Sequence, residues 1–249
     1  MKAMIFAAGL GTRLKPVTDT IPKALVPVGG EPMLWRTISK LRDAGISEII
    51  VNAHHFREKV VESIQSRDFG IDVRVSLEEG PEPLETGGGV RHAAKLLAEG
   101  GSGRFLVHNA DILSDLDMGW FLSRDDEGSL ATLLVVDRES DRYLLFDEGM
   151  NLVGWTNVRT SEVKSPYKDL DPSSCRRLSF CGIHVISESV FGLMEDWPER
   201  FGIIDFYLSV CDRHRIKGVL ASNLDIIDIG TPASLEEAER KILTIGKKY

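Results

Sequence analysis

Two glycines and two cationic side chains near the N-terminus have the types and the spacing that phosphate chemistry needs. Gly9 and Gly11 follow the apolar residues 4–7, where a buried strand gives way to a loop. Glycine lets backbone N–H groups approach a phosphate closely, while Arg13 and Lys23 supply a planar fork and a point charge that neutralise its oxygens. The segment therefore predicts a loop that binds the phosphates of a nucleoside triphosphate.

Gly-x-Gly also occurs in dinucleotide-binding loops and in ordinary turns, so the neighbouring residues must distinguish these kinds of loop. A dinucleotide-binding fingerprint needs a third glycine where this chain has Leu14, and a P-loop needs Gly-Lys followed by Ser or Thr. Neither pattern is present in the segment. Thr12 and the pair Pro22-Lys23 add to the glycines, and this combination favours triphosphate chemistry over an ordinary turn.

The combination resembles the signature of the sugar-1-phosphate nucleotidyltransferases, which carry Gly-x-Gly-Thr-Arg-Leu followed by Pro-Lys. The resemblance extends along nearly the whole chain, through Asn109-Ala110-Asp111, Phe180-Cys181-Gly182-Ile183 and Asp228-Ile229-Gly230-Thr231-Pro232. Residues 83–89 are most similar to those of N-acetylmuramate-1-phosphate uridylyltransferases and of mannose-1-phosphate guanylyltransferase-like members. The resemblance implies a Rossmann-like three-layer α/β/α fold with a mixed, mostly parallel central sheet.

The activity that the resemblance implies is Mg²⁺-dependent transfer of a nucleoside monophosphate from an NTP to a sugar-1-phosphate, giving an NDP-sugar and pyrophosphate. UTP with N-acetylmuramate-1-phosphate or a related hexose-1-phosphate is the expected substrate pair. A GTP-using mannose-1-phosphate guanylyltransferase and a non-catalytic regulatory protein that binds nucleotide-sugars stay open as alternatives. Because the attacking phosphate is already an anion, catalysis requires mainly cations and preorganised donors, and we assign it to Arg13 and Lys23.

Similarity to the family also assigns the residues that bind substrates. Arg13 and Lys23 are expected to contact the nucleotide together with Ala8, Gly9, Gly11, Thr12, Gly88 and Asn109. The sugar-binding candidates are Asn109, Asn157, Glu162 and Gly182. An Asx turn is the alternative role for Asn109. The family usually has glycine where this chain has Ala110, and the extra methyl group affects how closely a ribose or sugar approaches.

Asp111 and Asp228 are the expected Mg²⁺ ligands, because each ends a predicted strand and matches a metal-binding position of the family. Mg²⁺ in proteins typically takes one or two carboxylates and completes its octahedron with phosphate oxygens and water. An Asp at a strand end also commonly begins a turn or caps a helix. For Asp228 this alternative is strong, because Gly230, Thr231 and Pro232 read as a turn and a helix start.

Recognition of the base is expected from residues 78–89. The three glycines Gly87, Gly88 and Gly89 predict a turn before a helix, on which a flat base could lie, or a simple connection without a ligand. Glu78, Glu79 and Glu85 are candidates to accept a hydrogen bond from the base. Uracil and guanine are not distinguished by these residues.

Strand and helix patterns alternate through the first half and favour a parallel sheet. The expected strands are residues 2–7, 48–52, 71–76 and 104–108, and the expected helices are 32–44, 56–65 and one that follows Gly89. In the second half we expect strands at 131–136, 143–146, 152–157, 178–186, 218–221 and 225–229, helices at 187–195 and 204–211, and a terminal helix from Pro232. Residues 159–177 read as a polar, mobile excursion.

Composition agrees with one catalytic domain over residues 1–249, with a nucleotide-binding half up to about 115 and a sugar-binding half from about 116. Lys and Arg number 30 against 38 Asp and Glu, and the resulting net charge of −8 argues against general binding to nucleic acid or anionic membranes. Three cysteines without Cys-x-x-Cys spacing and the lack of a signal-peptide pattern lead us to expect a cytoplasmic protein. Homo-oligomerisation stays open.

Overall fold

The computed structural model describes residues 1–101 and 103–245. Its first half alternates strands and helices, as the sequence predicts. In order these elements are β1 (Lys2–Phe6), α1 (Met33–Asp43), β4 (Glu48–Ala53), α2 (Arg57–Gln65), β5 (Asp72–Leu77), α3 (Glu85–His92), α4 (Ala94–Ala98) and β6 (Arg104–Asn109). Between β1 and α1 lie three short 3-10 helices, η1 (Thr12–Leu14), η2 (Val17–Asp19) and η3 (Lys23–Leu25), and the strands β2 (Pro27–Val28) and β3 (Glu31–Pro32).

Four parallel strands of this half lie side by side in the order β6, β1, β4, β5. Their register aligns the last residue of β1, Phe6, with Asn52 on one side and Asn109 on the other. The carboxyl ends of parallel strands form the edge at which open α/β sheets bind ligands. The register therefore places these three side chains in one row at that edge.

The second half extends the same sheet with mostly antiparallel strands. Its elements are β7 (Ile112–Ser114), α5 (Met118–Leu122), β8 (Ala131–Val136), β9 (Arg142–Phe146), β10 (Leu152–Asn157), β11 (Glu162–Lys164), β12 (Arg176–Ser187), α6 (Val190–Leu193), α7 (Ile203–Val210), β13 (Ile216–Leu220), β14 (Ile226–Asp228) and α8 (Pro232–Ile245). The long strand β12 pairs antiparallel with β6, β8 and β9. Both halves of the chain thus contribute to one sheet.

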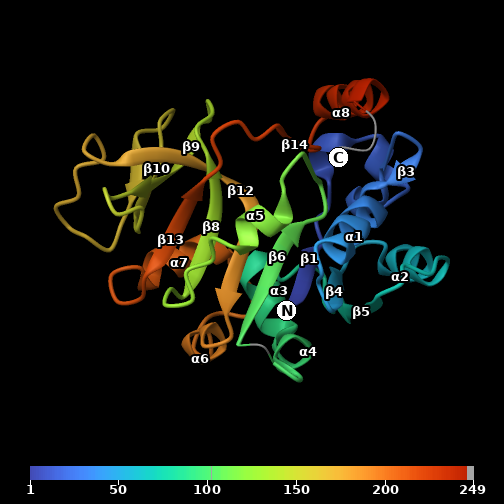
Figure 1. The fold of residues 1–249 in the computed structure, drawn as a ribbon, viewed down its shortest axis with the longest axis horizontal. Helices are drawn as coiled ribbons and strands as arrows, with labels where there is room; N and C mark the ends of the chain where they lie inside the picture. Colours follow the sequence, from blue (N-terminus) through green and yellow to red (C-terminus); the bar gives the residue numbers. More distant parts are fainter. Residues whose placement is uncertain (102, 246–249) are drawn as a thin grey trace.

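Helices cover both faces of the sheet and give the expected three layers (Figure 1). On one face α1, α2 and α5 pack against β1, β4 and β6, with Leu34, Ile38 and Phe121 fully buried. On the other face α3, α4, α6 and α7 bury a second cluster that includes Val90, Leu97 and Tyr207. No helix within the described ranges combines the length and the apolar character that a membrane crossing requires.

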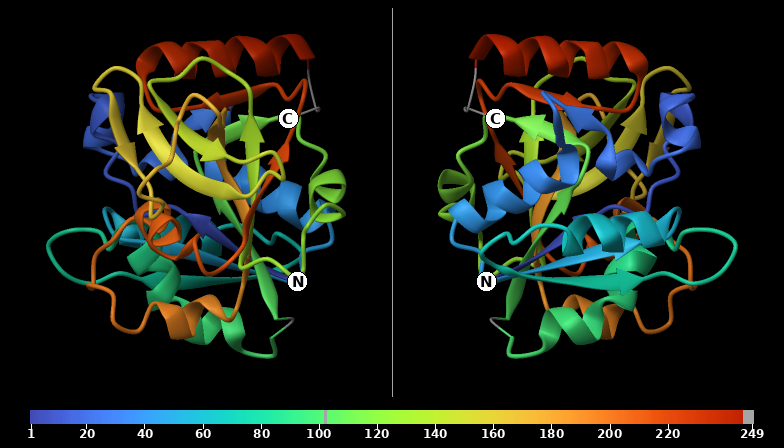
Figure 2. Two further views of the ribbon diagram at one scale, coloured as in Figure 1. Left: turned by 90° about the vertical axis from the view of Figure 1, so that its left-hand side faces the viewer. Right: turned by 90° about the vertical axis from the view of Figure 1, so that its right-hand side faces the viewer.

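The C-terminal helix α8 lies across one end of the molecule (Figure 2). Its Ala238 is fully buried in a separate apolar cluster that also contains Leu14 of η1, Val28 of β2 and Ile227 of β14. A hydrogen bond from Gly29 N to Glu239 Oε2, 2.9 Å long, adds a polar contact. The last helix therefore packs against the N-terminal segment that carries Gly9, Gly11 and Arg13.

Several sequence-based expectations differ from the structure. The turn expected at residues 87–89 is wrong, because these glycines lie inside α3, where contacts with Phe201 and residues 199–200 outweigh the weak helix propensity of glycine. The polar excursion at 159–177 contains a strand, β11, that pairs with β10. The helix expected at 187–195 is the shorter α6. Strand β7 and helix α5 were not predicted, since elements of three and five residues show no readable periodicity.

Lys40 joins α1 to strand β7. Its ammonium donates to the carbonyl oxygen of Ser114 and, at 3.3 Å, to the hydroxyl of the same residue. Burial lowers the pKa of Lys40 to about 8, although Asp115 and Asp117 oppose the change. The side chain thus fixes the far end of the short strand that begins directly after Asp111.

The pKa of Lys40 predicts a rise of stability with pH. Between its folded-state pKa of about 8 and its unfolded value of 10.5, the unfolded chain keeps a proton that the folded chain has released. The free energy of unfolding of the wild type, relative to that of Lys40→Met, should therefore increase by about 2 kcal/mol between pH 8 and pH 10. Urea denaturation of both proteins across this range measures the difference, and parallel pH profiles would contradict the expected role of burial.

Candidate active site

The signature loop, residues 7–23, is folded back on itself and not extended. Gly11 has a φ of 65°, and its carbonyl accepts hydrogen bonds from Leu14 N at 2.9 Å and Thr18 Oγ1 at 2.8 Å. A Cβ atom on Gly11 would lie 2.8 Å from the Thr18 methyl group, so the loop requires glycine there. Around Gly9, in contrast, a Cβ atom would meet nothing within 4 Å, because this residue faces open space.

Lys23 lies between two carboxylates. Its ammonium forms an ion pair and hydrogen bond with Asp111 Oδ2 and lies 3.6 Å from Asp228 Oδ1. The Lys23 and Asp111 side chains are 15% and 19% exposed, whereas Asp228 is 47% exposed. Burial raises the pKa of Asp111, the Lys23 ammonium opposes this rise, and the Asp228 carboxylate adds to it. One cation thus balances two converging negative charges.

A short pair of strands brings these carboxylates together across more than a hundred residues of sequence. Strand β14 pairs antiparallel with β7, which sets Asp228 opposite Ile112. The backbone N–H of Ile229 also donates to Asp111 O at 2.9 Å. A Cβ atom on Gly230 would lie 3.0 Å from the Arg13 guanidinium and 3.1 Å from Asp228 Oδ1, so Arg13 reaches the same corner.

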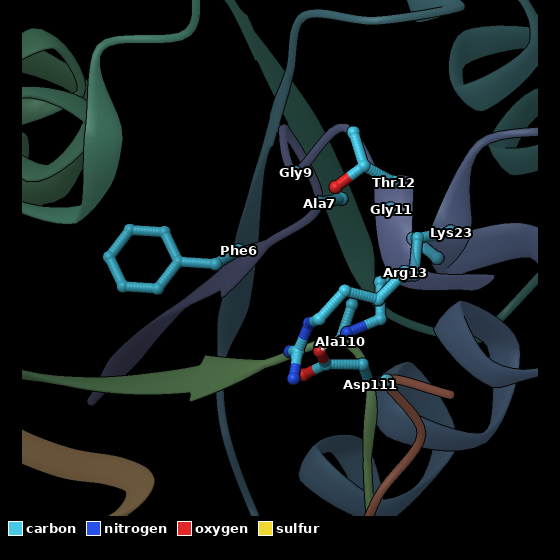
Figure 3. A pocket seen from close by; sticks show the side chains of 11 residues that line it. Phe6, Ala7, Gly9, Gly11, Thr12, Arg13, Lys23, Ala110 and Asp111 are labelled. Atoms are coloured by element: carbon cyan, nitrogen blue, oxygen red, sulfur yellow. Dashed lines mark hydrogen bonds and ion pairs between the residues drawn. The ribbon is translucent and has the colours of Figure 1, made fainter. Parts of the chain in front are cut away.

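A first cavity of about 180 Å³ adjoins these charges (Figure 3). Arg13, Lys23 and Asp111 line it from three segments of the chain, and the Phe6 ring lies apart from them (Figure 3). The other lining residues are Ala7, Gly9, Gly11, Thr12, Ala24, Ala110 and Gly230. Most of the signature residues expected to bind the nucleotide are thus brought together around one cavity, into whose wall Arg13, Lys23 and Asp111 bring charge.

A second cavity of about 370 Å³ continues from the first and shares Phe6, Gly9 and Asp111 with it. It is further lined by Ala8, Asn52, Pro83, Glu85, Thr86 and Asn109. Sequence reasoning missed Phe6 and Asn52 in this wall, whereas Pro83, Glu85 and Thr86 belong to the segment 78–89 from which base recognition is expected. A signal for Asn52 was present, because it is a polar residue within the otherwise apolar and buried run 49–53.

Asn109 and Gly182 are in direct proximity at the junction of the two halves. Gly182 has a φ of 70°, and a Cβ atom there would lie 2.4 Å from Asn109 Nδ2. Next to them, the N–H of Ala110 donates to Phe6 O at 3.1 Å, so this peptide is held against the end of β1. Asn109 therefore lies both in the wall of the second cavity and next to the second half of the chain.

The structure places Asn157 and Glu162 together but outside the walls of both cavities. They face each other in the register of β10 and β11. Asn157 Oδ1 accepts hydrogen bonds from Arg159 N at 3.0 Å and Thr160 N at 3.3 Å, which is a turn contact within the loop. Glu162 is exposed. Their role in binding the sugar stays a prediction.

Gly88 also lies outside both cavities. In α3 it is buried, and a Cβ atom would lie 2.5 Å from Glu199 O. The backbone N–H groups of Gly87 and Gly88 both donate to Phe201 O, at 2.9 and 3.1 Å. The start of α3 is thus capped by a loop of the second half, and in this arrangement these two N–H groups do not face a phosphate.

Replacing Gly88 with alanine should destabilise the fold by about 1–3 kcal/mol, because the new methyl group must displace the backbone at residues 199–200. Chemical denaturation measures the change. Gly192→Ala is the matched control, since Gly192 lies in helix α6 and a Cβ atom there would meet nothing within 4 Å. If Gly88→Ala is as stable as this control, the close packing of α3 on the loop is not required.

The Asp111 and Asp228 carboxylates fit a magnesium ion by their chemistry. Both are hard oxygen donors, they converge on one cation, and the first cavity beside them leaves room for phosphate oxygens and water. Within residues 1–101 and 103–245 no cluster of three or more His, Cys, Asp or Glu side chains has the geometry of a metal site. A metal held here would therefore depend on substrate oxygens for much of its coordination.

Comparison with known proteins agrees with this architecture. The N-acetylmuramate alpha-1-phosphate uridylyltransferase of Neisseria meningitidis serogroup B is 40% identical over 121 residues, which are 47% of this chain and 49% of that protein. A probable mannose-1-phosphate guanylyltransferase of Oryza sativa subsp. japonica is 30% identical over 136 residues, 54% of this chain and 38% of that protein. The chain thus spans about half the length, or less, of the curated relatives it matches.

A solved structure matches over a greater length. HddC from Yersinia pseudotuberculosis is 26% identical, with a TM-score of 0.72 over 97% of this chain and 99% of that one, and it has also been solved with GMP-PN. The family model described as nucleotidyl transferase matches residues 2–143, more than half of the 249 residues. The chain therefore belongs to the nucleotidyl transferase family.

Proposed function

We propose that this protein transfers a nucleoside monophosphate from an NTP to a sugar-1-phosphate and releases pyrophosphate. The observation that carries the proposal is the convergence of Lys23 on Asp111 and Asp228, beside Arg13 and the signature loop. Two carboxylates and two cations next to a glycine-rich loop suit a reaction between two anionic phosphates, which needs charge compensation and alignment more than acid–base chemistry.

The two joined cavities support a division of the nucleotide between them. In the polar first cavity, Arg13 and Lys23 would bind the β- and γ-phosphates and stabilise the negative charge that develops on the leaving pyrophosphate. In the second cavity, Phe6, Ala8 and Pro83 offer apolar contacts to the nucleoside, and Asn52, Thr86 and Asn109 offer polar ones. The sugar-1-phosphate would then approach from the second half, past Asn109 and Gly182.

Asp111 and Asp228 are the residues that would hold Mg²⁺. The ion, when bound, would neutralise charge on the phosphate oxygens. Lys23 contacts both carboxylates, so its ammonium would keep them in place until the nucleotide arrives and would then be near enough to contact a phosphate oxygen. The exposed Arg13 side chain lines the same cavity, so it would be able to contact the same phosphates.

For the substrate pair, we propose UTP with N-acetylmuramate-1-phosphate or a related hexose-1-phosphate. The 40% identity to the Neisseria uridylyltransferase supports this choice. GTP is the second candidate, supported by the rice guanylyltransferase and by the complex of HddC with GMP-PN.

Pyrophosphate release tests the proposal directly. The protein is incubated with Mg²⁺, one of several sugar-1-phosphates and each of UTP, GTP, CTP and ATP in turn. Release that depends on both substrates and on Mg²⁺, together with the matching NDP-sugar detected by mass spectrometry, would support it. Nucleotide binding without release for any pair would instead indicate a regulatory protein and would overturn the proposed activity.

A further inference from the structure

A buried hydrogen-bonded chain connects the two walls of the second cavity. Ala7 N donates to Asn52 Oδ1 at 2.7 Å, Asn52 Nδ2 donates to Glu78 Oε1 at 2.6 Å, and Leu84 N donates to Glu78 Oε2 at 2.9 Å. Asn52 and Glu78 are each 1% exposed. This series of hydrogen bonds begins at Ala7 in the signature loop and ends at Leu84. Leu84 is flanked by Pro83, Glu85 and Thr86 of the opposite wall, so the series links the two walls of the second cavity.

Gly89 provides the space for this pair. A Cβ atom on Gly89 would lie 3.0 Å from Asn52 Nδ2 and 3.0 Å from Glu78 Oε1. The backbone N–H of Glu78 is itself bonded to Ala53 O at 2.9 Å, which continues the pairing of β4 and β5 up to this carboxylate. The position of Glu78 is thus fixed by the sheet, and it in turn fixes Asn52.

The partners of Asn52 determine which way its amide points. The oxygen must face the Ala7 N–H donor and the nitrogen must face the Glu78 carboxylate, because the opposite orientation would oppose donor to donor and acceptor to acceptor. One N–H of Asn52 then has no partner among the described residues. Asn52 lines the second cavity, so this N–H is the group with which it can donate a hydrogen bond to a ligand there.

We propose that Asn52 is a specificity-determining residue that donates a hydrogen bond to a keto oxygen of the nucleobase, and that Glu78 is the positioning residue that holds it as a donor. The proposal rests on the proposed function. The keto oxygen meant is O4 of uracil or O6 of guanine, which accepts such a bond. The amino group that replaces this oxygen in cytosine or adenine is a donor, and it would leave two buried donors facing each other. The site therefore favours UTP over CTP and GTP over ATP.

Exchanging the amide of Asn52 and the carboxylate of Glu78 tests the hydrogen-bond donor at position 52 separately from the hydrogen bonds that hold it in place. In the double variant Asn52→Asp/Glu78→Gln, the new carboxylate at position 52 accepts from Ala7 N and from the new amide at position 78, whose oxygen still accepts from Leu84 N. The total charge is unchanged, yet no N–H of the side chain at position 52 is left for the cavity. Each single variant instead leaves at least one mismatched pair within the chain of hydrogen bonds.

The measurements are the thermal midpoint of each protein and its Kd for UTP, CTP, GTP and ATP by titration calorimetry with Mg²⁺. If the protein binds pyrimidine nucleotides, the wild type should bind UTP about tenfold tighter than CTP. If it binds purine nucleotides, it should bind GTP about tenfold tighter than ATP. This ratio is expected for one hydrogen bond gained and one mismatch avoided. The double variant should recover a wild-type midpoint while its Kd ratio falls close to one. Either single variant should have a lowered midpoint.

Asn151→Asp is the matched control. Asn151 Nδ2 donates to Asp147 Oδ2 at 2.9 Å, so this variant also opposes two carboxylates, but in a hairpin that does not line the cavities. It should lower the midpoint without changing the Kd ratios.

A wild type that binds CTP and ATP as tightly as UTP and GTP, or a double variant that keeps the keto preference, would overturn the role of Asn52. A double variant no more stable than Asn52→Asp would overturn the role of Glu78. Absence of binding by all four nucleotides would instead count against the proposed function itself.

Discussion

Replacing Lys23 with alanine should lower the rate of pyrophosphate release by about 10²–10³-fold, the range found when one preorganised electrostatic contact to a reacting group is removed. The ammonium contacts Asp111 and lies 3.6 Å from Asp228, in the wall of the cavity assigned to the phosphates. On the proposed function, its loss would remove a positive charge from the reacting phosphates and would leave the two carboxylates facing each other. Steady-state kinetics of the variant with saturating Mg²⁺ and both substrates measure the effect.

The same variant should also show a magnesium-dependent change of stability. Without the ammonium, repulsion between the two carboxylates should lower the thermal midpoint in metal-free buffer, and added Mg²⁺ should restore it. Lys15→Ala is the matched control, because Lys15 belongs to the same loop but pairs with Asp19 and is 60% exposed. A Lys23→Ala variant with the turnover of this control would show that Lys23 is not part of the catalytic site.

The Asp111→Asn variant should have a similarly large effect, with turnover reduced by about 10²-fold or more, because it removes one of the two carboxylates available to the metal. The amide keeps the shape of the side chain. Since burial and Asp228 already raise the pKa of Asp111, loss of this charge should not destabilise the fold in metal-free buffer. Activity measured across a series of Mg²⁺ concentrations should show a raised metal requirement together with the lower maximum.

Asp19→Asn serves as its control, since Asp19 is a half-exposed carboxylate of the signature loop with Lys15 as its ion-pair partner. It should keep wild-type turnover and an unchanged magnesium requirement. Wild-type kinetics in the Asp111 variant would remove Asp111 from the proposed metal site and would leave the convergence with Lys23 as a structural ion pair.

Much of the sheet could be predicted from the sequence, because several strands are buried on both faces and appear as continuous apolar runs, such as residues 49–51 and 133–136. The glycine run at 87–89 was misread for a physical reason. Glycine signals either a turn or a close approach of other atoms, and only the folded chain shows that Phe201 and the Glu199 carbonyl occupy the space where side chains would be.

The candidate site, like the sheet, could be predicted from the sequence only in part. Arg13 and Lys23 were assigned from their types and spacing in the loop as well as from resemblance to a family. Asp111 and Asp228 were assigned from their place at strand ends and from the same resemblance, and the structure brings all four residues to one corner. No local pattern could have paired Asn52 with Glu78, because their contact depends on the adjacency of β4 and β5 and on the absence of a side chain at Gly89. Long-range register, which periodicity does not encode, decides such contacts.

The pairing of β14 with β7 has a consequence for synthesis on the ribosome. The chain emerges from its N-terminus, so the parallel strands β1, β4 and β6 and the carboxylate of Asp111 become available long before Asp228 and α8. Until β14 emerges, Lys23 has only one of its two acidic partners, and the apolar residues Leu14 and Val28 lack the cover of α8. We therefore expect a nascent chain to form its parallel strands early and to bring Lys23, Asp111 and Asp228 together only after β14 has emerged.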